Sequence, residues 1–327
     1  MNRRQLGSSN LQLTEIGFGA WAIGGGGYAF GWGPQDDADS IAALRRALDL
    51  GVNWIDTAAV YGLGHSEEIV AKALEGRRED VILATKCTRR WNGVGEVYGD
   101  MSAAGIRWEC EQSLKRLKTD RLDLYQIHWP DPEERIEEAW EAVNALIQDG
   151  KVRYGGVSNF TAAQMERAQK LHPIASLQPP YSLMRRRIEG DEFAFCRKHK
   201  IGVIAYSPMQ SGLLTGKFHL DRVAPDDWRR RSTEFQEPNL GVNLWFVEQL
   251  RGIAANYSKT PAQLAIAWVL RDPVVTAAIV GTRHPAQIEE TVGGAGWKLN
   301  ADDLKRIDEL LDERARRVQA AGGVVRR

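Results

Sequence analysis

The sequence has few cysteines and no long apolar run, and each of these absences excludes a class of protein. Its three cysteines, Cys87, Cys110 and Cys196, are odd in number and far apart. This spacing argues against a disulfide framework and indicates a reducing compartment. No apolar stretch approaches the roughly 18 residues of a membrane-spanning helix. The N-terminus also lacks an apolar signal core, so we expect a cytoplasmic protein.

A net charge is also missing, because 43 basic residues (Lys and Arg) balance 43 acidic ones. We therefore expect no nucleic-acid or membrane partner, and the runs Arg229–Arg231 and Arg326–Arg327 should lie on solvated surface. The 6 histidines are scattered, and no Cys/His spacing is typical of zinc, so we expect no metal site. The sequence fits a monomer and a homo-oligomer equally.

The sequence does contain a regular alternation of strand-like and helical segments. Apolar strand-like segments occupy 15–19, 52–56, 81–86, 123–128, 153–158, 175–178, 202–207 and 275–280. Helical patterns lie near 38–50, 66–75, 103–117, 134–149, 162–171, 190–199, 260–271 and 285–292. Gly51 and Gly150 follow helix ends, and Pro261 lies at a helix start. Eight strand–helix pairs predict an α/β fold, a closed (β/α)8 TIM barrel rather than an open doubly wound sheet.

Two segments interrupt this alternation. One is an insertion at 207–256, after the seventh strand, and the other is the C-terminal stretch from Trp297, in which 302–316 predicts an extra amphipathic helix on the outside. No linker rich in Pro, Gly or Ser divides the chain. We therefore expect residues 1–327 to form a single domain.

The segment Gly17–Ala22 matches a loose dinucleotide fingerprint, G-x-G-x-x-A, but its context argues against that function. In the fingerprint, the glycines open a helix whose N-terminus holds a pyrophosphate. Here four consecutive glycines, Gly24–Gly27, follow, and such a run disfavours a helix. We interpret the glycines as a mobile loop after the first strand that folds over a ligand.

Chemically active side chains follow three consecutive predicted strands. Asp56, Lys86 and His128 end the second, third and fourth strands, and Tyr61 lies in the loop after Asp56. Each alone could be an exposed loop residue, a helix cap or a packed core residue. Because strand ends of a barrel of this type meet at one mouth, their convergence predicts a catalytic site.

The residues around these positions resemble the aldo-keto reductase family. The matching blocks run in order over nearly the whole chain: Asp56-Thr57-Ala58-x-x-Tyr61-Gly62, His65–Glu67, Ala84–Lys86, Asp123–Trp129, Gly155–Phe160, Ala205–Pro208, Gly212–Lys217 and Ile279–Arg283. The resemblance implies an enzyme that uses NADPH (NADP+) to reduce aldehydes or ketones to alcohols, reversibly. It also implies that Asp56, Tyr61, Lys86 and His128 form the catalytic tetrad.

These residue types suit carbonyl reduction, which needs a proton donor at the carbonyl oxygen. A free tyrosine has a pKa of about 10. We expect the Lys86 ammonium to lower the pKa of Tyr61 and make it a general acid, while Asp56 keeps Lys86 charged. His128 would orient the carbonyl and stabilise charge on its oxygen.

The resemblance also implies a cofactor site. Ser158, Asn159 and Gln178 would bind the nicotinamide carboxamide, and Tyr206 would stack on the ring. Arg283 would meet the 2′-phosphate, whereas Thr291 departs from the family pattern at the adenine. The expected cofactor residues are Gly19, Ala20, Trp21, Asp56, Ser158, Asn159, Gln178, Tyr206, Ser207, Pro208, Met209, Gln210, Ser211, Gly212, Leu213, Lys217, Gly281, Thr282, Arg283, Gln287 and Glu290.

The substrate pocket is expected at Trp21, Trp32, Tyr61, His128 and Trp129, with Trp91 as a further aromatic wall and Trp54 in the core. Such a pocket suits a small apolar or aromatic carbonyl compound. Two alternatives stay open. One is a cofactor-binding scaffold with little turnover, like the β subunits of potassium channels, and the other is a barrel lyase in which Lys86 forms a Schiff base.

Overall fold

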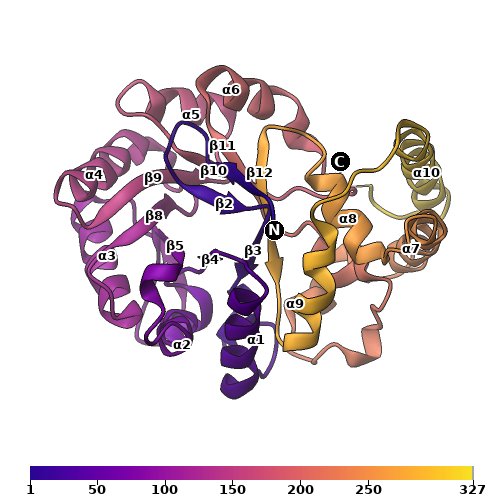
Figure 1. Cartoon of the computed structure of the whole chain (residues 1–327), viewed down its shortest axis with the longest axis horizontal. Helices are drawn as coiled ribbons and strands as arrows, with labels where there is room; N and C mark the ends of the chain where they lie inside the picture. Colours follow the sequence, from indigo (N-terminus) through magenta and orange to yellow (C-terminus); the bar gives the residue numbers. More distant parts are fainter. Residues whose placement is uncertain (326–327) are drawn as a thin grey trace.

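Eight parallel strands close into a barrel surrounded by helices, as the strand–helix alternation predicts (Figure 1). The computed structural model describes residues 1–325, so the Arg326–Arg327 pair lies outside the described residues. Around the barrel the strands are β3 (Ile16–Gly19), β4 (Trp54–Asp56), β5 (Ile82–Cys87), β8 (Leu122–Ile127), β9 (Val152–Ser158), β10 (Ser176–Gln178), β11 (Gly202–Ala205) and β12 (Val275–Gly281). The barrel closes where β12 pairs with β3.

The predicted helices are all present, with ends that shift by a few residues. They are α1 (Asp37–Asp49), α2 (His65–Ala73), α3 (Ala103–Leu117), α4 (Ile136–Gln148), α5 (Ala162–Gln169), α6 (Asp191–His199), α8 (Pro261–Val269) and α9 (Pro285–Thr291). Gly51 and Gly150 adopt φ of 86° and 74° after the ends of α1 and α4, where a side chain would be strained. Pro261 is the first residue of α8. The segment Gly17–Ala22 leads only into a short 3-10 turn, Trp21–Gly24, and the first α-helix begins at Asp37, so these glycines do not open an α-helix as the fingerprint requires.

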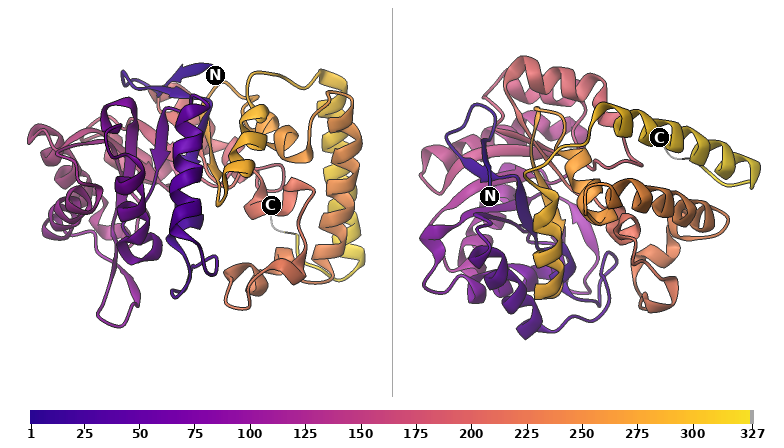
Figure 2. Two further views of the ribbon diagram at one scale, coloured as in Figure 1. Left: turned by 60° about the horizontal axis from the view of Figure 1, so that its bottom comes forward. Right: turned by 45° about the vertical axis from the view of Figure 1, so that its right-hand side comes forward.

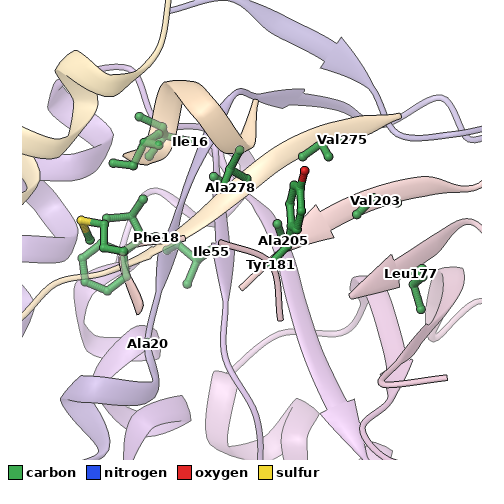
Figure 3. Close-up of a cluster of buried hydrophobic side chains, with 14 of the residues drawn as sticks. Ile16, Phe18, Ala20, Ile55, Leu177, Tyr181, Val203, Ala205, Val275 and Ala278 are labelled. Atoms are coloured by element: carbon green, nitrogen blue, oxygen red, sulfur yellow. The ribbon is translucent and has the colours of Figure 1, made fainter. Parts of the chain in front are cut away.

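The period of two along each strand divides the core into two clusters. Ile55, Val203 and Ala278 pack outward against the helices, in the cluster that Figure 3 shows in part. Trp54 and Ile204 belong to a second cluster, which fills the barrel and confirms the expected core position of Trp54. The same alternation places Asp56 on the same face of β4 as Trp54, and Lys86 on the same face of β5 as Ala84.

An N-terminal hairpin closes the end of the barrel at which the strands begin. Its strands, β1 (Arg3–Gln5) and β2 (Gln12–Thr14), pair in antiparallel fashion, and Leu6, Leu11 and Leu13 join the inner cluster. The Trp54 indole donates to Thr14 O at 3.0 Å. This hairpin was not predicted, because strands of three residues are too short to show alternation.

Two further elements were not predicted. A hairpin of β6 (Arg89–Trp91) and β7 (Val97–Gly99) follows β5, and α7 (Asn239–Ala255) lies within the 207–256 insertion. Apolar residues on its more open side, such as Leu244, obscured the period of α7. The predicted C-terminal helix is confirmed as α10 (Ala301–Ala320), which packs beside α7 outside the barrel (Figure 2). Within residues 1–325, no helix is both long and apolar enough to cross a membrane.

Candidate active site

The carboxyl ends of the strands open into a cavity of about 910 Å³. We call the side chains of Asp56, Tyr61, Lys86, His128 and Gln178 the floor, since they lie at strand ends or just beyond them. We call the segments 21–35 and 207–231, together with Arg283, Gln287 and Glu290, the rim. All of the floor residues except Lys86 line the cavity, as do most of the predicted cofactor residues.

Lys86 is the centre of the floor. Its side chain is buried, and Nζ donates to Asp56 Oδ2 at 2.6 Å, to Thr57 O at 2.9 Å and to the Tyr61 hydroxyl at 3.1 Å. The structure thus brings Asp56, Tyr61 and Lys86 together as the sequence predicts. Three acceptors leave the amine without a free direction, and this argues against the Schiff-base lyase, which needs an amine open to substrate.

Burial governs the ionisation of the floor. It lowers the pKa of Lys86, although the adjacent Asp56 carboxylate opposes that shift. Burial also lowers the pKa of His128 well below its ordinary value of 6.5, with the positive charges of Lys86 and Arg89 acting in the same direction. His128 is therefore a neutral imidazole near pH 7, and it meets the Tyr61 ring edge-on with centroids 5.8 Å apart.

The expected lowering of the Tyr61 pKa is wrong for this structure. Burial raises the pKa of the phenol well above 10.0, and the Asp56 charge raises it further. The physical reason is the ion pair behind it. Because Asp56 lies 2.6 Å from the Lys86 ammonium, the two charges largely cancel at the phenol, and the cost of burying a phenolate remains. Tyr61 is consequently protonated at neutral pH.

The floor continues into the residues expected at the nicotinamide. Gln178 donates from Nε2 to Asp56 Oδ1 at 2.7 Å, and the Ser158 hydroxyl donates to Gln178 O at 2.8 Å. Asn159 adopts a left-handed φ of 63° and donates to His128 O at 3.0 Å. Tyr206 donates in turn to Asn159 Oδ1 at 3.0 Å. One chain of hydrogen bonds therefore joins the predicted cofactor residues to the acid–base group.

The rim holds two cations that the resemblance assigns to the cofactor, Lys217 in the loop expected along the pyrophosphate and Arg283 at the adenosine end. Lys217 Nζ forms an ion pair with Glu290 at 2.6 Å. Arg283 instead donates to Gln35 Oε1, Trp32 O and Pro34 O, and the acceptors that it meets in the described part of the chain are uncharged. Of these two cations, Arg283 is the one whose charge no carboxylate in the described part of the chain pairs directly.

Aromatic rings form the substrate side of the cavity. Trp21 stacks on Tyr61 with ring centroids 6.2 Å apart, and Trp32 meets Trp21 edge-on at 5.1 Å. Trp129 is exposed at the mouth. These predicted pocket residues all line the cavity, whereas Trp91 does not and lies against Arg116.

Some predictions about single side chains need correction. Arg229 and Arg230 are half-buried rather than solvated, because Arg229 pairs with buried Asp227 at 2.6 Å and lies over Trp32. Four expected cofactor side chains do not line the cavity; these are Ala20, Gln210, Leu213 and Thr282. Gln210 instead donates to Glu234 Oε2 at 2.7 Å. Thr291, whose contact was in doubt, does line the cavity.

Sequence reasoning missed several residues that line the cavity. They belong to segments without a periodic pattern, and include Tyr28, Phe30, Arg89, Val97, Phe218, Arg222 and Arg229. Only the density of aromatic residues after Gly27 and after Lys217 could have indicated them. Among residues 1–325, no cluster of three or more His, Cys, Asp or Glu side chains could hold a metal ion.

Comparison with known proteins agrees with this geometry. The model of the Aldo/keto reductase family matches residues 15–312. The chain is 40% identical to aldo-keto reductase YhdN of Bacillus subtilis over 316 residues, 95% of this chain and 94% of that one. It is 33% identical to the NADH-specific methylglyoxal reductase of Escherichia coli, over 95% of this chain and 99% of the other.

Solved structures agree as well. The glycerol dehydrogenase AKR11B4 from Gluconobacter oxydans superposes with a TM-score of 0.87 at 38% identity, covering 96% of both chains. The holo form of aldo-keto reductase AKR11C1 from Bacillus halodurans gives a TM-score of 0.77 at 30% identity, covering 95% of this chain and 96% of that one. The chain therefore belongs to the aldo/keto reductase family and is an NAD(P)H-dependent oxidoreductase.

Proposed function

We propose that this enzyme reduces aldehydes or ketones to alcohols with NADPH, reversibly, with Tyr61 as the proton donor. The observation that carries the proposal is the contact between Lys86 Nζ and the Tyr61 hydroxyl, on a lysine that Asp56 holds at 2.6 Å. The bound nicotinamide supplies a hydride to the carbonyl carbon. The alkoxide that results is a stronger base than a phenolate, so Tyr61 can protonate it despite its raised pKa. The neutral His128 would direct the carbonyl oxygen toward Tyr61.

The cavity fits the proposed cofactor along its length. Tyr206, Asn159 and Gln178 lie at the floor end, where the nicotinamide would bind. Gly281 lines the same cavity and has open space where a Cβ would stand. At the far end, Arg283 offers a guanidinium that could form two hydrogen bonds with a 2′-phosphate. That unpaired charge supports NADPH over NADH, although one relative is named as NADH-specific.

We propose small carbonyl compounds as substrates. Two relatives are named for small oxygenated molecules, glycerol and methylglyoxal, and this supports a substrate of that size. Trp21, Trp32 and Trp129 provide apolar walls that would also accept an aromatic aldehyde. We therefore expect a broad range of carbonyl compounds.

The test follows loss of NADPH absorbance with methylglyoxal, glyceraldehyde and 4-nitrobenzaldehyde, and repeats each assay with NADH. We expect turnover of at least one carbonyl compound and a higher kcat/KM with NADPH. Tight NADPH binding without turnover of any of them would contradict the proposal and favour the scaffold alternative. Equal kcat/KM with both cofactors would overturn the NADPH assignment alone.

A further inference from the structure

Thr88 adopts an unusual backbone conformation directly beside the floor. It follows the end of β5, two residues after Lys86, with a left-handed φ of 74° and no exposed surface. A β-branched residue rarely adopts this conformation, because its Cβ crowds the backbone. Such conformations persist where the surrounding structure enforces them, and they are frequent at functional sites.

Thr88 joins the strand that carries Lys86 to the segment that carries His128. Its hydroxyl donates to Trp129 O at 3.3 Å, and its own carbonyl accepts from Asp100 N at 3.3 Å. The adjacent Cys87 O accepts from His128 N at 3.1 Å. A change in the Thr88 backbone would therefore displace the Lys86 amine relative to the His128 ring.

A buried carboxyl group accepts a hydrogen bond from the Thr88 backbone. Glu109, on α3, is 2% exposed, and its Oε1 accepts from Thr88 N at 2.9 Å. Within the described residues its other oxygen, Oε2, has no hydrogen-bond partner, and neither has Arg90 Nε. Burying a carboxyl group with an unsatisfied oxygen lowers the free energy of unfolding, and Glu109 takes part in none of the proposed catalytic contacts.

We propose that Glu109 is a positioning residue: through Thr88 it fixes the junction between β5 and the segment after β8, and so sets the Lys86–His128 geometry. The inference rests on the proposed roles of those two residues. This role would explain both the left-handed Thr88 backbone and the burial of the Glu109 carboxyl group.

The ionisation of Glu109 provides a distinctive readout. Burial raises the pKa of this carboxyl to about 8, opposed by the Thr88 N–H and by Arg90. The acidic neighbours Asp100 and Glu67 raise it as well. The other titratable groups near it come from β5, β8 and α3; they are Cys87, Tyr125 and Cys110. As the group ionises above about pH 8, the new charge lies near Thr88 N and near Arg90, whose Nη1 pairs with Asp100 but whose Nε has no partner in the described residues, so we expect a step in kcat there.

The experiment compares Glu109→Leu, which removes the acceptor, with Glu109→Gln, which keeps an acceptor oxygen but cannot ionise. Glu111→Gln is the matched control, because this residue of the same helix pairs with Lys151. We expect Glu109→Leu to lower kcat at least about tenfold while leaving the Kd of NADPH unchanged. Glu109→Gln should keep kcat within about threefold at pH 7 and abolish the step near pH 8.

Some results would overturn the inference. They are a Glu109→Leu enzyme with the kcat of the Glu111→Gln control, or a Glu109→Gln enzyme that keeps the step near pH 8. If Glu109→Leu does not fold, Thr88→Val removes only the hydroxyl bond to Trp129 O and should still lower kcat severalfold; an unchanged kcat would refute the proposal. A wild type that binds NADPH but reduces nothing would instead refute the proposed function.

Discussion

The floor and the rim of the cavity differ in how their polar groups are satisfied. At the floor, Lys86, Asp56 and Gln178 bind one another through side chains at 2.6–2.7 Å. At the rim, the part of the chain described here leaves several buried polar atoms without partners: Tyr28 Oη, Trp32 Nε1, Trp228 Nε1 and Glu290 Oε1. Because buried polar groups normally have hydrogen-bond partners, the rim satisfies its buried polar atoms less completely than the floor does. The strand ends and the turn after β4 thus carry the groups of the proposed chemistry, whereas the rim loops beside the cavity carry polar atoms that lack partners within residues 1–325.

The rim segments also contact one another. Arg231 donates to Ala29 O at 2.9 Å, and Trp228 stacks on Trp21 with ring centroids 5.7 Å apart. Arg283 donates to the loop at Trp32 O and Pro34 O. A cofactor phosphate that binds Arg283 would therefore compete with these loop contacts.

The largest expected effect concerns the floor. Lys86→Met removes the partner of both Tyr61 and Asp56, and should lower kcat by about 10²–10⁴-fold, the scale of general acid–base catalysis. It also leaves the buried Asp56 carboxylate unpaired, which should destabilise the fold by about 3–5 kcal/mol. The double variant with Asp56→Asn should recover stability, measured by urea unfolding, without recovering turnover. A stable double variant with wild-type turnover would show that Lys86 is not required for catalysis.

The next effect concerns the rim. Arg283→Ala should raise the Kd of NADPH by roughly ten- to a thousand-fold, because each charge-assisted hydrogen bond contributes about 1.5–3 kcal/mol. The Kd of NADH should hardly change, and kcat at saturating NADPH should stay near wild type. Quenching of tryptophan fluorescence measures both constants. Arg306→Ala is the control, since this exposed arginine of α10 pairs with Glu309 and does not line the cavity. Equal weakening of both cofactors would move Arg283 away from the 2′-phosphate.

A smaller effect on stability separates the packed interior of the barrel from the open end of β12. A Cβ at Gly17 would lie 2.0 Å from the Trp54 ring, whereas one at Gly281 would meet nothing within 4 Å. Gly17→Ala should therefore cost about 1–3 kcal/mol of unfolding free energy through overpacking. Gly281→Ala should stay within about 0.5 kcal/mol of wild type. Denaturant unfolding of both variants tests the difference, and equal stabilities would contradict it.

The smallest effect is a pH dependence of stability from His128. Its pKa in the folded protein lies well below 6.5, so below that pH the unfolded chain binds more protons than the folded one. Stability is then lost as the pH falls, by up to about 1.4 kcal/mol per pH unit. His128→Gln should reduce the loss between pH 7.5 and 5.5 in urea unfolding. An unchanged slope in this variant would show that His128 is not buried as a neutral ring.

The sequence predicts the floor better than the rim for a physical reason. A period of two and strict strand–helix alternation place Asp56, Lys86 and His128 at neighbouring strand ends, and the barrel then brings them together. The β6–β7 hairpin has strands of only three residues, and exposed apolar residues obscure the period of α7. The position of Arg229 over Trp32 depends on a contact between distant loops, which leaves no periodic signal. The raised pKa of Tyr61 depends first on the burial of the phenol and then on the Asp56 charge beside Lys86, and sequence spacing shows neither.

The central claim is that Tyr61 donates the proton in carbonyl reduction, and single-turnover kinetics of Tyr61→Phe test it most directly. The variant loses one hydroxyl, which accepts from Lys86 at 3.1 Å, and keeps the ring that stacks on Trp21. With enzyme-bound NADPH and a saturating carbonyl compound, we expect the rate of NADPH oxidation to fall by at least about 10²-fold, with the Kd of NADPH unchanged. A single-turnover rate equal to that of the wild type would contradict the assignment of Tyr61 as the proton donor.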